Sequence, residues 1–293
     1  MADTQELTED TVNSEAISNT EEKPADTEVK RDDSEQSGAI FQAVGVITGE
    51  IKFTDEGKSS VTIGRREYPL FYAPRKQKAF EALKKEIEAT GEHTQRLIVY
   101  PKIIHFPKRE QPAQITFQLV GFDRGRQAEA VSGELQDLEF KLCGLWQFIP
   151  VCQTPCISVF RNFNKERLEY IKQAELAKKV KFMKASHLPV IWRDGPVRPF
   201  RFNPKATKEE QGHPAFVQIK ARFLPQRDVF GFVEQLAEPT ETAPKFLKAS
   251  KQDKASAQAA KKAAKRDKPP VQAEKPAEKP AEKIAKPKPK PKV

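Results

Sequence analysis

The chain has 293 residues, 31% of them charged, and a formal net charge of +10. This length allows about two domains, because single hydrophobic cores stop growing well before it is reached. No stretch approaches the roughly 20 apolar residues that a membrane-spanning helix needs, and the amino terminus lacks a basic region followed by an apolar run, so we expect a cytoplasmic protein with no membrane partner.

Charge divides the chain into three parts. Residues 1–39 hold twelve Asp and Glu against three basic residues, and residues 248–293 hold fifteen Lys and Arg against five acidic residues, in repeats such as AEKPAEKPAEK. Neither part has the apolar surface to form a core, so both are predicted to be disordered tails. The block between them carries 33 basic and 24 acidic residues. A polyanion is the partner that this charge favours.

The first half of the central block begins as strands. Residues 41–51 read as one strand, and residues 61–72 form two alternating runs joined by a basic corner at Arg65 and Arg66, either a hairpin or one strand that continues through a bulge. The period then changes to that of an amphipathic helix over residues 75–90. Strands resume at LIVYPKIIHFP and QITFQLVGF.

The second half repeats this pattern. Residues 133–163 supply up to three strands, and Asn164 caps a helix with an apolar stripe and a lysine-rich flank. A strand pair around an Asp-Gly turn is predicted in residues 187–204, and residues 213–224 with 228–236 close the sheet.

The order strand, strand, strand, helix, strand, strand fits a small Greek-key barrel of the OB type. We therefore predict a mainly β protein with two helices, built as two consecutive OB-like barrels over residues 40–125 and 133–247 between the tails. The segments PAQITFQLVGF and PAFVQIKARFL suggest an internal duplication. The chain resembles tandem OB-fold-like proteins, and LCGLWQFIPV with PVRPFRFNP is similar to uncharacterised cyanobacterial proteins. This resemblance implies small barrels and no known catalytic site.

Catalytic and metal-binding patterns are not visible in the sequence. There is no nucleophile beside a base, no paired carboxylates in an apolar setting and no phosphate-binding glycine loop, so we expect no enzyme activity and no cofactor. Cys152 and Cys156 lack the two further ligands that structural zinc requires, and buried thiols are expected instead. His93, His105 and His213 stand alone, as surface or capping histidines do.

The strand at residues 213–224 is the first candidate for binding. Strand alternation places Val217 and Ile219 on a core face and puts a ring and two cations on the opposite face, which would stack bases and contact phosphates: Phe216, Lys220 and Arg222. The alternative is an ordinary half-buried strand with solvent-facing charges.

Arginines and aromatic residues also interleave in WRDGPVRPFRF, residues 192–202. Arg198 and Phe200 are predicted to clamp or stack a nucleotide; alternatively, Phe200 and Phe202 are core residues and the arginines are solvent charges. The corresponding face of the first half carries Gln118 and its neighbours without charge, so the first barrel is expected to bind less, or to bind something else.

Two hypotheses for the function follow. The first is a non-catalytic, sequence-tolerant binder of RNA or single-stranded DNA that uses Arg65, Arg66 and the residues above, with a basic tail that contacts phosphates and an acidic tail that competes with them. The second is a scaffold whose barrels bind a protein partner through sheet edges or through the apolar region from Trp146 to Phe148.

Overall fold

The computed structural model describes residues 38–266, apart from 55–57, 107–110, 124–132 and 208. The prediction of a disordered acidic tail falls almost wholly outside the described residues, and so does the part of the basic tail from 267 onward. Among the helices described, none is both long and apolar enough to cross a membrane.

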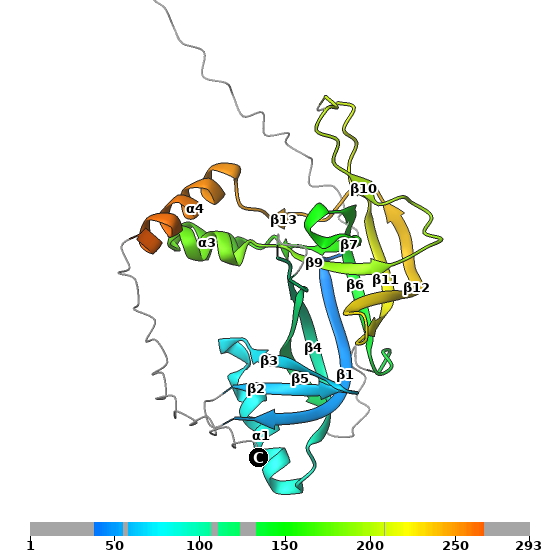
Figure 1. The fold of residues 1–293 in the computed structure, drawn as a ribbon, viewed down its shortest axis with the longest axis vertical. Helices are drawn as coiled ribbons and strands as arrows, with labels where there is room; N and C mark the ends of the chain where they lie inside the picture. Colours follow the sequence, from blue (N-terminus) through cyan, green and yellow to red (C-terminus); the bar gives the residue numbers. More distant parts are fainter. Residues whose placement is uncertain (1–37, 55–57, 107–110, 124–132, 208, 267–293) are drawn as a thin grey trace, which may run out of the picture. The chain divides into compact units, whose positions relative to one another are not determined.

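The first half forms a closed five-stranded barrel (Figure 1). Its strands are β1 (Gln42–Phe53), β2 (Ser59–Ile63), β3 (Arg66–Tyr72), β4 (Thr94–Ile104) and β5 (Gln114–Asp123). They pair in the order β1-β2-β3-β5-β4, and β4 pairs with β1 to close the barrel. The β3–β5 pair is parallel and the other pairs are antiparallel, so this half has the Greek-key order of an OB barrel.

The helix of the first barrel lies where the sequence predicts it, between the third and fourth strands. A 3-10 turn, η1 (Pro74–Lys76), leads into α1 (Gln77–Thr90), which buries Phe80, Leu83 and Ile87 on one face. Gly91 ends the helix with φ of 69°, a left-handed conformation that a residue without a Cβ adopts at no steric cost.

The second half closes into a barrel of the same strand order. Its strands are β6 (Glu139–Phe148), β7 (Pro155–Val159), β9 (Ser186–Ile191), β11 (Phe216–Leu224) and β12 (Val229–Thr240). They pair in the order β6-β7-β9-β12-β11, and β11 pairs back to β6. The β9–β12 pair is parallel, as β3–β5 is in the first barrel. The mainly β architecture of small OB-like barrels is confirmed.

The helices of the second half differ from the prediction of one helix. The stretch after Asn164 forms two helices, α2 (Lys165–Gln173) and α3 (Leu176–Phe182), because the backbone at Ala174 is extended, with ψ of 147°. They follow the second strand of the barrel, whereas the sequence placed the helix after the third.

A fourth helix lies in the region predicted to be a structureless tail. Helix α4 (Lys251–Arg266) follows Ser250, whose Oγ accepts a hydrogen bond from the Asp253 N–H at 2.9 Å. The helix packs on α3 and buries Ala257. Alanine, lysine and glutamine are strong helix formers, and packing on α3 adds the tertiary support that an isolated helix lacks. The described part of the chain therefore has four helices where two were predicted.

The predicted hairpin in residues 187–204 is also wrong. The chain leaves β9, passes the Asp-Gly turn and forms the short strand β10 (Phe200–Arg201), which pairs with β6 in parallel. Another pair of short strands, β8 (Arg161–Asn162) and β13 (Phe246–Leu247), brings the segment before α4 beside the segment before α2.

Strand β1 links the two barrels into one continuous sheet. Its first residues pair with β6, and its middle pairs with β4. A polar contact adds to this link: Asp228, in the turn between β11 and β12, accepts hydrogen bonds from Arg66 at 2.5 Å and from the Tyr68 hydroxyl at 2.9 Å.

Candidate functional site

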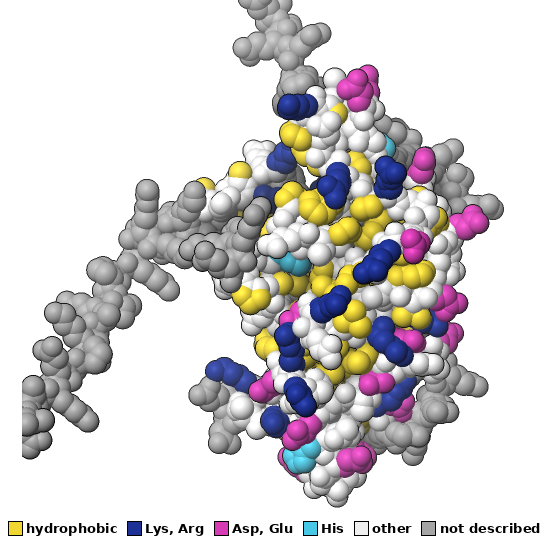
Figure 2. Space-filling model, turned by 45° about the vertical axis from the view of Figure 1, so that its right-hand side comes forward, with side chains coloured by type: hydrophobic (Ala, Val, Ile, Leu, Met, Phe, Trp, Pro, Cys, Tyr) yellow, Lys and Arg dark blue, Asp and Glu magenta, His cyan; other side chains and the backbone are white. Residues whose placement is uncertain are grey.

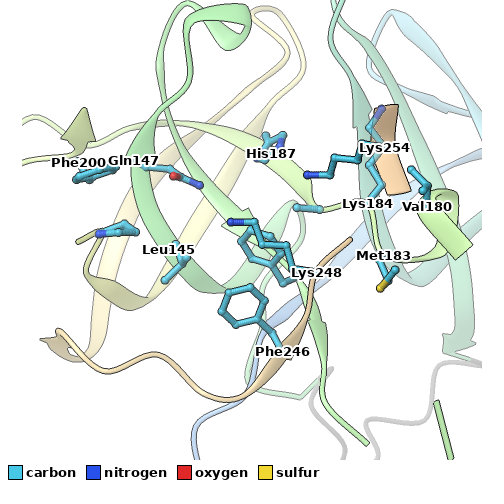
Figure 3. Close-up of a pocket in the computed structure, with 13 residues that line it drawn as sticks. Leu145, Gln147, Val180, Met183, Lys184, His187, Phe200, Phe246, Lys248 and Lys254 are labelled. Atoms are coloured by element: carbon cyan, nitrogen blue, oxygen red, sulfur yellow. The ribbon is translucent and has the colours of Figure 1, made fainter. Parts of the chain in front are cut away.

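A cavity of about 570 Å³ lies between the outer face of the second barrel and helices α3 and α4 (Figure 3). We call it the basic groove and define it by the three rings and three cations that line it, which are Phe160, Phe200, Phe246, Lys184, Lys248 and Lys254. Its volume falls in the range of small-molecule and nucleotide pockets.

The three rings reach the basic groove from segments far apart in the sequence. Phe246 precedes α4 and lies against Phe160, with ring centroids 4.5 Å apart. Phe41, just before β1, is buried and contacts both rings edge-on. Phe200 is held in place because β10 pairs with β6. All three rings are partly exposed.

The cations line the helical side. Lys184 follows α3, Lys248 precedes α4 and Lys254 lies in its first turn, and all three side chains are exposed. Among the described residues that line this cavity there is no Asp or Glu. The carboxylate next to Lys254 in sequence, Asp253, pairs instead with Lys179, at a distance of 3.7 Å. The basic groove is therefore positively charged, which favours an anionic ligand.

Gln147 and His187 form the polar side of the basic groove, and the buried Ser158 connects them by hydrogen bonds. The Gln147 amide donates to Ser158 Oγ at 2.6 Å, and Ser158 Oγ lies 2.7 Å from His187 Nδ1. The neighbouring barrel contributes as well, because His105 Nε2 lies 2.8 Å from the His187 carbonyl oxygen. Burial, reinforced by His105, Lys184 and Lys254, lowers the pKa of His187 to about 4, so the imidazole is neutral at pH 7.

A second hollow of about 430 Å³ adjoins the basic groove and shares Phe200 with it. Phe202 lines this hollow and is 70% exposed. Beside it, the guanidinium of Arg201 lies over the Phe148 ring, 4.4 Å from its centroid. Arg198 is exposed in the same segment. Of the interleaved residues 198–202, the two rings Phe200 and Phe202 line these cavities, and the two arginines do not.

The structure separates the predicted site residues. Phe200 lines the basic groove, whereas Arg198 is exposed two residues before it and lines neither cavity. Phe216, however, is only 1% exposed, and its ring packs edge-on against Phe41 at 5.2 Å. The prediction that Phe216 is a stacking platform is wrong, because the face of β11 opposite the barrel interior is covered at this point by Phe41 and its neighbours. The alternation itself holds, since Val217 and Ile219 point into the core.

The two β11 cations that were predicted to contact phosphates, Lys220 and Arg222, lie beside carboxylates instead. Lys220 Nζ is 3.1 Å from Glu234 on β12, and this hydrogen bond raises the pKa of the lysine. Arg222 lies 3.8 Å from Glu139. Neither residue lines the basic groove.

At the corner between β2 and β3, Arg66 pairs with Asp228 while Arg65 is exposed. Figure 2 shows one face of the molecule, where Lys and Arg side chains are interspersed with hydrophobic ones. Exposed cations also lie outside the predicted set, for example Lys184, Lys248 and Lys254.

The burial of the cysteines and of Trp146 decides whether these residues can form the sites considered for them. The three cysteines are buried, as predicted. Within the part of the chain that the structure describes, no cluster of three His, Cys, Asp or Glu side chains is placed to hold a metal. In the region from Trp146 to Phe148 that the scaffold hypothesis named, Trp146 is 2% exposed and donates to the Val197 carbonyl at 3.2 Å, so this ring is not available for docking, whereas Phe148 is half-buried.

Sequence reasoning missed most of the basic groove. The sequence pattern shows Lys184 only as part of a lysine-rich helix flank, and it places Lys248 and Lys254 in a predicted disordered tail. The available signal was a run of strong helix formers after Ser250, a preferred N-cap residue. Nothing in the local pattern places this helix against α3.

Comparison with known proteins identifies no family. A scan against protein-family models gives no match, and a search of curated proteins gives none. Among solved structures, the chain is similar to a deletion mutant of the single-stranded DNA binding protein from Thermus aquaticus, at 13% sequence identity and a TM-score of 0.30, over 71% of this chain and 96% of that one. A likeness at this level supports no conclusion about function. The resemblance to cyanobacterial proteins stays a prediction.

Proposed function

We propose that this protein binds single-stranded nucleic acid, RNA or DNA, in the basic groove, without catalysis and without strong sequence preference. The observation that carries the proposal is the pairing of three partly exposed rings with three exposed lysines around one cavity. Rings stack on any base, and lysines contact phosphates as point charges, so this combination suits a sequence-tolerant single-strand site.

The position of the basic groove supports the proposal. In OB folds the outer face of the second and third strands is the usual oligonucleotide surface. These strands are β7 and β9 in the second barrel. His187 of β9 lines the basic groove, and the buried Ser158 of β7 lies 2.7 Å from its Nδ1. The Gln147 amide and the neutral His187 imidazole offer hydrogen-bonding groups that a base edge can use without adding charge.

The residues to which we assign phosphate contact and base stacking differ from those that the sequence favoured. Lys220 and Arg222 face carboxylates on the β11–β12 surface, whereas Lys184, Lys248 and Lys254 face a cavity without acidic residues among its described lining. We therefore assign phosphate contact to these three lysines. We assign stacking to Phe160, Phe200 and Phe246.

Salt titrations of affinity test this proposal. The full chain is titrated against a fluorescently labelled single strand of about 8 nucleotides, within the site size of one OB fold. Each phosphate contact contributes roughly 0.7 to the slope of log affinity against log salt for single strands, so Lys184→Ala with Lys248→Ala should reduce the slope by about 1.4. Lys78→Ala with Lys85→Ala, two exposed lysines of α1, is the matched control and should leave it unchanged.

The two pairs of variants change the net charge equally, so a general effect of charge would move both. If the two double variants gave equal slopes of log affinity against log salt, the assignment of phosphate contact to the basic groove would be contradicted. Absence of any binding by the unmodified chain would overturn the proposed function itself.

A further inference from the structure

The first barrel has a surface of its own that the proposed function does not use. Phe71 on β3 and Tyr100 on β4 are 54% and 42% exposed. Both are cross-strand partners of one residue, Gln118 on the intervening strand β5. The three side chains therefore form a single row across three adjacent strands, which lie side by side in Figure 1.

This row points away from the barrel core. The residues next to it along the strands, Leu70, Val99 and Phe117, are buried in the core, so alternation directs the row outward. Adjacent strands are about 4.8 Å apart, which places the backbones carrying the two rings roughly 10 Å from each other with an amide between them. Single exposed aromatic residues are common, whereas two in one cross-strand row form an organised surface.

The chemistry of the row matches a base-stacking platform. Sheet faces that carry aromatic rings on neighbouring strands stack two or three bases of a single strand. The Gln118 amide can donate to and accept from a base edge between the rings. The next row pairs Thr116 with the exposed Lys102, which supplies a cation for a phosphate. Neither row contains Asp or Glu among the paired residues that the structure describes.

We propose that Phe71, Gln118 and Tyr100 form a second contact for single-stranded nucleic acid, which stacks bases of a strand whose other end occupies the basic groove. This inference rests on the proposed function, since it extends the same ligand onto the first barrel. Two contacts on one chain convert the second binding event into an intramolecular one, so long strands gain affinity that short strands do not.

The test compares strands of about 8 and roughly 30 nucleotides, one and two or more OB site sizes. Phe71→Leu with Tyr100→Leu keeps apolar volume and removes both rings. It should weaken binding of the long strand by roughly fivefold or more for each ring and leave the short strand within about twofold of the unmodified chain. Phe71→Tyr with Tyr100→Phe keeps both rings and should bind both strands normally.

The outcomes separate the two proposals. If the ring-removing variant binds the long strand as tightly as the unmodified chain does, the second contact is overturned and the basic groove is unaffected. If Lys184→Ala with Lys248→Ala leaves binding of the short strand intact while the ring-removing variant loses the long strand, the first barrel is a site and the basic groove is not. If the unmodified chain binds neither strand, both proposals fail.

Discussion

Substitution of Phe216 by alanine should lower the stability of the fold and leave the affinity for nucleic acid unchanged. The alternation of β11 alone predicts the opposite, because it places Phe216 on the exposed face. The side chain is 1% exposed and packs with Phe41, Cys143 and Leu145. Phe→Ala substitutions in such surroundings cost about 3–5 kcal/mol. At roughly 2–4 °C for each kcal/mol in a domain of 150–250 residues, the melting temperature should fall by about 6–20 °C.

The matched variant is Phe200→Ala, which removes a partly exposed ring of the basic groove. It should weaken binding to a short single strand by about 1–3 kcal/mol and lower the melting temperature far less than Phe216→Ala does. Thermal melting and anisotropy titration of both variants, with affinity expressed per folded molecule, make the comparison. The reasoning is refuted if Phe216→Ala melts normally and loses binding, because that ring would then be accessible to the ligand.

Three further predictions concern acid stability, strand packing and helix α4. His187 has a folded pKa of about 4, below the unfolded value of about 6.5, so its contribution to stability is present above pH 6.5 and is lost as the pH falls toward 4. His187→Gln should therefore reduce the loss of unfolding free energy between pH 6.5 and 4 in denaturation curves. An unchanged pH dependence would show that other groups cause the loss. A Cβ on Gly144 would lie 2.6 Å from the Ser158 carbonyl oxygen, so Gly144→Ala should destabilise the fold by at least about 1–3 kcal/mol in urea denaturation, whereas Gly121→Ala, with its nearest heavy atom at 4.0 Å, should change it little. Truncation after Arg266 should keep α4, whereas truncation after Ser250 also removes Lys254 and uncovers the face of α3 against which α4 packs. The shorter chain should therefore have the lower affinity and melting temperature of the two; equal behaviour of the two truncations would count against α4 as part of the site.

The barrels could be predicted from the sequence because their signals are local. Alternation identified most strands, and the change of period over residues 75–90 with Gly91 after it located α1. The break between α2 and α3 could not be predicted, because the apolar stripe continues across Ala174 although the backbone there is extended rather than helical. Helix α4 was hidden by composition, because a lysine-rich, alanine-rich segment forms a stable helix only when a surface such as α3 is available.

The site was less predictable than the fold because it depends on contacts between distant segments. Alternation correctly divided β11 into two faces, but it does not report what covers the outer one, and Phe41 covers it from 175 positions earlier in the chain. Similarly, Lys220 looked available until the register of β11 with β12 placed Glu234 opposite it. The basic groove combines strands β6 and β9 with the segments around α3 and α4, which only the tertiary structure brings together.

Photo-crosslinking tests the central claim most directly. The full chain is irradiated with a single strand of about 8 nucleotides that carries a photoreactive base, and the crosslinked peptides are identified by mass spectrometry. Binding in the basic groove predicts crosslinks in the peptides that contain Phe160, Phe200 or Phe246, and their loss at high salt because the lysine contacts are screened. Crosslinks confined to the β11–β12 surface around Lys220 and Arg222 would contradict the claim.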